Sequence, residues 1–321
     1  MLRSAPSAVP RRLPAVLLAL LALVALAGCG GGSGVADQSA SEVLRSTFGP
    51  NRAVHSGRLD LRVTATGLQA SQQPLEVGLR GPFAGSGSNA QPRFDLDASL
   101  TARGVGVTGG VVSTGSAGFL GIGNQSYALD AKTYDAFKQA YAQEGTGTST
   151  TAKGSTLGAL GIDPVRWLRD PKKAKSETVA GVKAVHVTAS VDVPALLGDV
   201  TKILARANTA GAAAAAGQDV QLTDAERQTI QAAVRSSRFD VWTGEDDGLL
   251  RRVLVEVDYD VPAAQRDAAG GLTKGTLSLG LTLADLNEKQ TIVAPKGAKP
   301  ISELTSALAQ LSAGAGSGTG G

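Results

Sequence analysis

The sequence has few of the side chains from which catalytic and metal centres are built. It contains one cysteine, two histidines and one methionine in 321 residues, and aromatic residues make up 4% of the chain. A lone cysteine cannot form an internal disulfide, and two histidines leave little imidazole for metal binding or proton transfer. No G-x-S-x-G nucleophile motif occurs either. We therefore expect neither enzymatic activity nor a bound cofactor or metal.

The remaining motifs of catalytic type have simpler interpretations. Gly104–Gly109 fits G-x-G-x-x-G, but the residues that follow continue as a strand pattern instead of a helix, which excludes a dinucleotide-binding turn. Residues 245–247 form an acidic cluster between glycines, which is typical of a solvated hairpin turn. His186 alternates with apolar residues, which predicts a solvated histidine on the polar face of a strand. His55 precedes a strand, which predicts a loop position.

The chain also lacks an excess of charge once its N-terminus is set aside. The full sequence carries 31 basic and 28 acidic side chains. Residues 1–28 contain Arg3, Arg11 and Arg12 and no acid, so the remainder has 28 side chains of each sign. This balance gives no bulk cationic surface, and we expect no nucleic-acid partner.

The N-terminus has the pattern of an export signal. Arginines precede an apolar run at Ala15–Ala27, which is shorter than the roughly 20 residues that a membrane-spanning helix needs. Leu26-Ala27-Gly28-Cys29 resembles the bacterial lipobox, which implies cleavage before Cys29 and lipid attachment to its sulfur. We expect a signal peptide at 1–28 and a lipid-anchored protein on the extracytoplasmic face of the cell membrane. An uncleaved apolar helix is the alternative, and Arg11-Arg12 leaves Sec and twin-arginine export both open.

The rest of the chain is predicted to form one α+β domain. Residues 29–40 are Gly-rich and predict a flexible tether, residues 41–311 the domain, and residues 312–321 a disordered Gly-rich tail. Strict alternation in segments such as "SGRLDLRVTAT" and "PRFDLDASLTA" predicts antiparallel strands with one apolar face. Asp130 is a predicted N-cap for a helix with an aromatic stripe, and Asp163-Pro164 a predicted start of a helix that carries Trp167 and Leu168. These helices would cover the apolar face of the sheet.

Several segments together resemble the LppX/LprG-type bacterial lipoproteins and, more distantly, the LolA-like carriers. They are "SYALDAKTYDAF", "GIDPVRWLRDPKKAKSETVAGVKAVHVTASVDVPALL", "DVWTGEDDGLLRRVLVEVDY" and "IVAPKGAKPISEL". The resemblance implies a strongly curved antiparallel sheet, a half-barrel, with helices over its concave face. It also implies an apolar cavity that holds the acyl chains of a lipid, glycolipid or lipidated molecule for transport or presentation. "GTGTSTTAKGST" and "TAGAAAAAGQD" have no counterpart in it.

A set of apolar side chains is expected to line such a cavity. The candidates are Leu59, Leu61, Val63, Leu75, Val77, Leu79, Phe94, Leu96, Tyr134, Phe137, Tyr141 and Trp167. The alternative is a closed core without cargo, in which the protein acts as an envelope interaction or sensor module and binds a protein partner. We expect a monomer in either case.

Overall fold

The computed structural model describes residues 34–49, 54–67, 73–85, 93–145, 164–198, 224–266 and 273–306. The expected signal peptide, Cys29 and the Gly-rich tail lie outside these residues, as does "TAGAAAAAGQD". "GTGTSTTAKGST" lies outside them from its second residue on, and the side chain of Tyr141 is also not described. The predictions made for these parts stay predictions.

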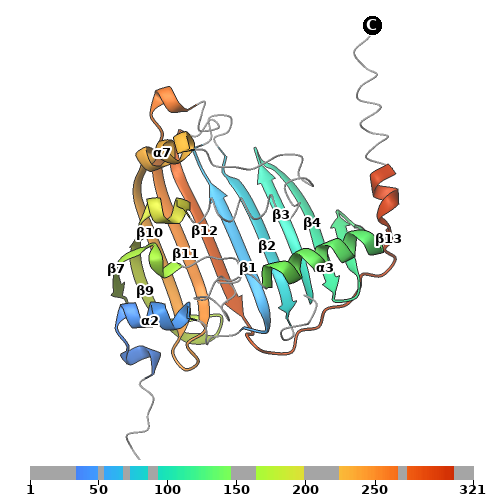
Figure 1. The fold of residues 1–321 in the computed structure, drawn as a ribbon, viewed down its shortest axis with the longest axis horizontal. Helices are drawn as coiled ribbons and strands as arrows, with labels where there is room; N and C mark the ends of the chain where they lie inside the picture. The colour runs from blue at the N-terminus through green and yellow to red at the C-terminus, as the bar shows by residue number, and fades with distance from the viewer. Residues whose placement is uncertain are drawn as a thin grey trace, which may run out of the picture.

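One large sheet dominates the described part of the chain. Its strands follow the order β13-β6-β5-β4-β3-β2-β1-β12-β11-β10-β9-β7, and β8 also pairs with β9. All pairs are antiparallel except β13 with β6. The strands are β1 (Ser56–Ala65), β2 (Leu75–Ala84), β3 (Arg93–Ala102), β4 (Val105–Thr114), β5 (Gly118–Ile122), β6 (Gln125–Ala128), β7 (Leu168–Lys173), β8 (Glu177–Val179), β9 (Val182–Val191), β10 (Val234–Gly244), β11 (Leu250–Asp260), β12 (Lys274–Ala284) and β13 (Lys299–Pro300). The expected α+β class with a curled, unclosed antiparallel sheet is confirmed (Figure 1).

The helices are η1 (Val35–Asp37), α2 (Ala40–Thr47), α3 (Ala131–Gly145), η2 (Pro164–Arg166), α7 (Asp224–Ala233) and η3 (Ala263–Gln265), and residues 193–198 and 301–306 are also helical. Of these, α2 and α3 lie over the concave face of the sheet, whereas α7 lies at one end of the strands and residues 301–306 lie beyond the β13 edge (Figure 1). α2 lies over β9 and β10 near one edge of the sheet, whereas α3 lies over the strands near the other edge. The predicted helix at Trp167 is shorter than expected, because η2 ends at Arg166 and Leu168 already begins β7.

Side chains fix where the two main helices begin. Ser39 caps α2 in a capping box, in which the Ser39 hydroxyl accepts from the Glu42 amide and the Glu42 carboxylate accepts from the Ser39 amide. Asp130 caps α3 as predicted, because its carboxylate accepts from the backbone amide and the hydroxyl of Thr133. The pKa of Asp130 is lowered by the backbone hydrogen bond from Thr133 in the first place.

The main core lies under α2 and η2, at the β9–β11 part of the sheet. Its buried members are Val35, Val43, Leu44, Phe48, Trp167, Leu168, Val185, Val187, Ala189, Val191, Phe239, Val241 and Val253. Val35 belongs to the segment that was expected to be a flexible tether, yet it is only 4% exposed. The folded part of the chain therefore includes η1 and begins before residue 41, because Val35 buries an apolar side chain against the sheet.

Candidate functional site

A continuous row of apolar side chains crosses the concave face of the sheet. The cross-strand pairs are Phe239–Val255, Val255–Leu279, Leu279–Val63, Val63–Val77, Val77–Leu100 and Leu100–Val107. Directly paired residues project from the same face of a sheet, so this row, the apolar ladder, runs without interruption from β10 to β4.

The two ends of the apolar ladder differ in coverage. The exposed fraction is 3% for Phe239 in β10, 37% for Leu279 in β12 and 41% for Val77 in β2. It rises further to 46% for Leu100 in β3 and 60% for Val107 in β4. The same face is therefore a closed core at β9–β11, the closed half, and an incompletely covered apolar surface at β12 and β1–β4, the open half.

α2 closes the first of these halves. The ring of Phe48 packs edge-on against Phe239, with centroids 6.5 Å apart. The buried hydroxyls of Thr47 and Thr243 lie 2.7 Å apart, and Thr47 also donates to the carbonyl of Val43. Apolar packing and a paired polar group thus fix α2 to β10.

α3 crosses the second half near its far edge. Tyr134 is buried, and its hydroxyl lies 2.8 Å from the hydroxyl of Ser113 in β4. The ring of Phe137 packs edge-on against Phe94 of β3 at 6.1 Å between centroids. A Cβ atom at Gly118 would lie 2.6 Å from the Tyr134 ring, so glycine permits this close approach. α3 thus covers the Phe94 end of β3 and leaves Leu100 exposed.

The predicted wall residues fall into three groups. Leu59, Leu61, Val63, Leu75, Leu79, Phe94 and Leu96 are half-buried in β1–β3, and Val77 is exposed. Tyr134 and Phe137 pack between α3 and the sheet. Trp167 lies apart from both groups in the buried cluster of the closed half. The structure therefore brings together the strand residues and α3, but not Trp167.

Sequence reasoning missed the most exposed members of this surface. We define the exposed apolar face as Val77, Leu100, Val105, Val107, Ile122, Leu277 and Leu279, all exposed large hydrophobic side chains in β2–β5 and β12. Leu100, Leu277 and Leu279 are apolar members of alternating strands, so alternation alone marks them. Their exposure depends on which strands pair, because β12 joins the group only through its long-range pairing with β1.

The opposite, convex face carries polar side chains, and His186 lies there. It is not solvated as expected, because its Nε2 lies 2.8 Å from Asp240 Oδ1 and its Nδ1 lies 3.3 Å from Glu177 Oε1. Its ring stacks on Trp242 at 4.3 Å, and the Arg252 guanidinium lies over the Trp242 ring at 5.0 Å. Alternation predicted the face correctly, but it does not report neighbours on adjacent strands.

The acidic hairpin turn between β10 and β11 is also more ordered than a solvated turn. Glu245 accepts hydrogen bonds from Lys183 and from the Ser176 hydroxyl, and the Lys183 bond is the largest cause of its lowered pKa. Asp247 pairs with the guanidinium of Arg251, whose side chain is buried. These contacts assign the two carboxylates to holding the turn.

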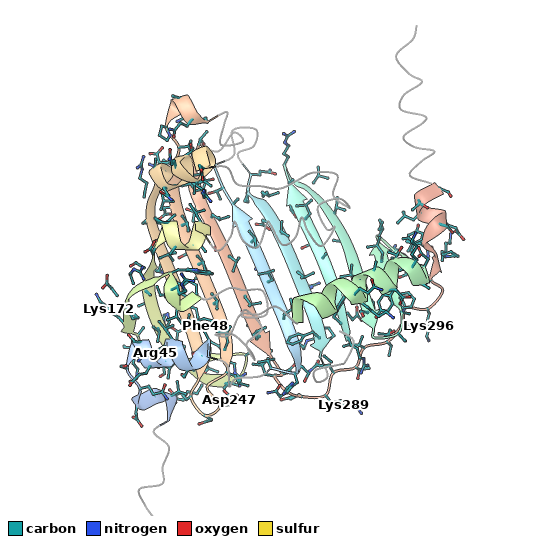
Figure 2. The ribbon with its side chains drawn as sticks, viewed as in Figure 1. Arg45, Phe48, Lys172, Asp247, Lys289 and Lys296 are labelled. Carbon is teal, nitrogen blue, oxygen red and sulfur yellow. The ribbon has the colours of Figure 1, made fainter. Side chains whose placement is uncertain are left out.

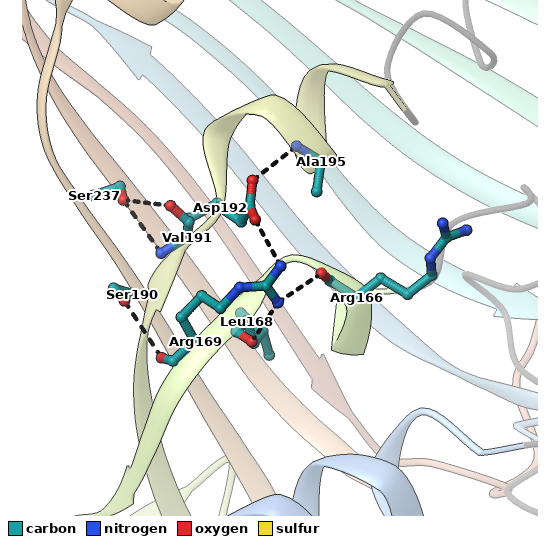
Figure 3. Close-up of polar contacts among 8 residues, drawn as sticks. All are labelled: Arg166, Leu168, Arg169, Ser190, Val191, Asp192, Ala195 and Ser237. Carbon is teal, nitrogen blue, oxygen red and sulfur yellow. Dashed lines mark hydrogen bonds and ion pairs between the residues drawn. The ribbon is translucent and has the colours of Figure 1, made fainter.

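A pocket of about 640 Å³ lies elsewhere, among β7, β9, the start of β10 and α7. Figure 3 shows the contacts around its Arg169–Asp192 ion pair, which is 2.6 Å long. Arg169 also donates to the carbonyls of Arg166 and Leu168, and Ser237 bridges to the β9 backbone. Since these polar groups bind one another, the network is explained by structure alone.

Neither a membrane-spanning helix nor a metal-binding cluster is present within the described ranges. No helix there is both long and apolar enough to span a bilayer. The same residues contain no cluster of three or more histidine, cysteine or acidic side chains arranged to hold a metal ion.

No protein-family model and no curated protein matches the chain. Among solved structures it is similar to LprF from Mycobacterium bovis, with 11% identity, a TM-score of 0.39, and coverage of 80% of this chain and 97% of that chain. The lipoprotein LppX from Mycobacterium tuberculosis has 11% identity, a TM-score of 0.35, and coverage of 79% and 98%. A LolA superfamily protein from Nitrosomonas europaea has 7% identity, a TM-score of 0.18, and coverage of 79% and 95%. These are proteins of the kind that the sequence resembles.

Proposed function

We propose that this chain is a membrane-anchored envelope lipoprotein that binds the acyl chains of a lipid, glycolipid or lipidated molecule on the exposed apolar face. The observation that carries the proposal is the apolar ladder, which runs from a closed core into the exposed apolar face and contributes four of the seven hydrophobic side chains of that face. Large contiguous apolar patches mark binding surfaces in soluble domains, because leaving them in water is unfavourable.

Desolvation is sufficient to hold such a ligand. Each Å² of apolar surface removed from water contributes roughly 25 cal/mol, and an acyl chain laid across the ladder would bury surface on both partners. Neighbouring strands lie about 4.8 Å apart, so β12 to β4 offers a path of roughly 19 Å. The seven side chains are valine, leucine and isoleucine, which have no nucleophilic or acid–base group. The exposed apolar face can therefore bind a ligand by burial alone, and we propose no enzymatic activity for it.

Paired substitutions on the two faces of one strand test the ligand site. Leu100→Glu places a charge on the exposed apolar face, whereas Ser99→Glu places the same charge on the convex face of β3. Val107→Glu and Thr108→Glu form a second such pair in β4, where Leu100 faces Val107 and Ser99 faces Thr108. We expect the first member of each pair to weaken binding of a fluorescent fatty acid at least tenfold, a change that corresponds to 1.4 kcal/mol.

The convex-face controls should bind like the unmodified protein. Native mass spectrometry of the unmodified protein should also show copurified lipid. Protein that carries no lipid and does not bind the fatty acid, but retains a protein partner, would instead support the envelope interaction module.

Lipid attachment at Cys29 is tested separately. We expect the membrane-bound form to begin at Cys29 with a diacylglyceryl mass on its sulfur. Cys29→Ser should leave the chain unprocessed and without this mass. A membrane-bound chain that retains residues 1–28 would contradict the anchor and leave the ligand site untouched.

A further inference from the structure

His186 lies between two carboxylates on the convex face of the sheet. Its Nε2 atom lies 2.8 Å from Oδ1 of Asp240 in β10, and its Nδ1 atom lies 3.3 Å from Oε1 of Glu177 in β8. Only 14% of the His186 side chain is exposed. An ionised carboxylate accepts hydrogen bonds and donates none, so both contacts are favourable only when both ring nitrogens carry protons. The arrangement therefore fits the imidazolium ion.

The two carboxylates differ in how firmly they are held. The Asp240 side chain is 4% exposed, and its Oδ2 atom accepts from Nε of Arg238 at 2.6 Å. The Glu177 side chain is 51% exposed and belongs to a strand of three residues. When His186 loses one proton, the other stays on Nε2, because moving it to Nδ1 would leave the buried Asp240 carboxylate facing a nitrogen lone pair. Glu177 then loses its ion pair.

β8 is a short strand that contributes to a small apolar cluster. Among the described residues it pairs with β9 alone, over Glu177–Val179. Its Val179 side chain is buried with Ala184 and Trp242. The residues just before β8 are held by the Ser176 hydroxyl, which donates to Glu245. Short strands at an edge open locally more readily than core strands, so the loss of one ion pair is expected to change how often β8 opens.

Other charged side chains surround His186 on the same face. Residues paired across strands share a face, and the pairings of β7 to β11 place there Lys172, Glu177, Arg238, Asp240, Arg252 and Glu256. Arg238 also binds Glu256 at 3.1 Å, and the Arg252 guanidinium lies over the Trp242 ring. Lys172 at the outer edge of the sheet (Figure 2) and Lys175 in the link to β8 are exposed. Of these residue types, histidine alone ordinarily changes its charge between about pH 5 and 8.

We propose that His186 is a pH-sensitive attachment for β8: its imidazolium form holds Glu177 to the sheet, and loss of the Nδ1 proton to water loosens β8. The attachment is strong in mildly acidic solution and weak in mildly alkaline solution, because only the protonated ring attracts both carboxylates. Opening of β8 would remove Val179 from its cluster and uncover the Trp242 ring on the convex face.

Nitrogen-15 NMR of the histidine rings tests the protonation step on the proposed mature chain, residues 29–321. The sequence contains two histidines, so His55→Gln identifies the signals of His186. We expect both ring nitrogens of His186 to be protonated at about pH 5 and Nε2 alone at about pH 8. A neutral ring protonated on Nδ1, or the same protonation at both pH values, would overturn the proposal.

Hydrogen exchange supplies the second measurement. After correction for intrinsic exchange rates, protection of β8 should fall several-fold from about pH 5 to about pH 8. Glu177→Gln should remove this difference, because an amide both donates and accepts and can pair with either form of the ring. His55→Gln is the matched control and should retain it. Protection of β8 that is equal at both pH values, or an unchanged difference in Glu177→Gln, would contradict the proposal.

This inference is independent of the proposed function. His186 and β8 lie on the face opposite to the exposed apolar face, and neither measurement involves a lipid. A failure of the pH-sensitive attachment is thus distinguishable from a failure of the acyl-chain site or of the anchor.

Discussion

The closed half and the open half of the sheet are built from the same kind of strand, but their apolar side chains are buried in the first and partly exposed in the second. Phe239 and Leu100 belong to one apolar ladder, yet Phe239 meets the ring of Phe48 from α2, whereas Leu100 is 46% exposed. Strand sequence alone therefore does not decide which half is a core. The difference comes from the helices, because α2 lies over its strands at the ladder and α3 lies over the Phe94 end of β3.

The sequence left two alternatives open, a closed core and an apolar surface for acyl chains, and the two halves of the sheet correspond to one each. A closed core is present at β9–β11, where it supplies the apolar packing on which a stable fold depends. The open half leaves apolar surface available for a ligand. Measurements that compare the halves should show stability concentrated in the first and binding in the second.

The largest expected difference is in the cost of truncating one ladder residue in each half. Phe239→Ala should lower the free energy of unfolding by about 3–5 kcal/mol, because it leaves a cavity under α2. Leu100→Ala should lower it by less than about 1 kcal/mol, because much of that side chain is already in water. Urea unfolding measures both. Similar losses for the two variants would mean that the open half is packed as tightly as the closed half.

A smaller effect is expected where α3 joins the open half. Ser113→Ala removes the partner of the buried Tyr134 hydroxyl and should cost about 1–3 kcal/mol. Tyr134→Phe removes the hydroxyl itself and should cost less. Hydrogen exchange should become faster in α3 and stay unchanged in α2. Faster exchange in both helices would show that the halves unfold as one unit.

The smallest effect concerns the cap of α2 in the closed half. Ser39→Ala should lower the free energy of unfolding by about 1 kcal/mol at neutral pH. The Ser39 hydrogen bonds lower the pKa of Glu42 in the folded protein, so its contribution is present above the ordinary Glu pKa. That contribution is lost as the pH falls through the lowered value.

The stability difference between the Ser39→Ala variant and the unmodified protein should therefore become smaller in acid, while the part due to the hydrogen bond from the Glu42 amide to the Ser39 hydroxyl remains. Urea unfolding at several pH values provides the measurement. A difference that is constant between neutral and acidic pH would exclude this contribution of Glu42.

Local patterns predicted much of the fold. Period-two alternation located β1, β2, β3 and the β10–β11 hairpin, and the Asp130 cap located α3, because these depend on neighbours in sequence. The hairpin turn at 244–248 was also expected. The antiparallel class and the apolar side of each strand followed from the same signal.

The rest depended on contacts between distant segments. Trp167 is predicted to line a cavity because it is a large apolar residue near a helix, but the fold places it in the buried cluster of the closed half, which also contains Val35 and Phe239. His186 was assigned to solvent because its strand face is polar, but Asp240 and Trp242 on the adjacent strand surround it. The contacts of His186 with Asp240 and Trp242 can be inferred only when the pairing of β9 with β10 is known.

β12 is the last long strand among the described residues and pairs with β1 on one side and β11 on the other. During synthesis or export, the meander from β1 to β6 and the segment from β7 to β11 emerge before residues 274–284 can join them. Until then β1 has an unpaired edge, which is prone to aggregation. Completion of the sheet must therefore await residues 274–284, and a chaperone that shields β1 would have its greatest effect in that interval.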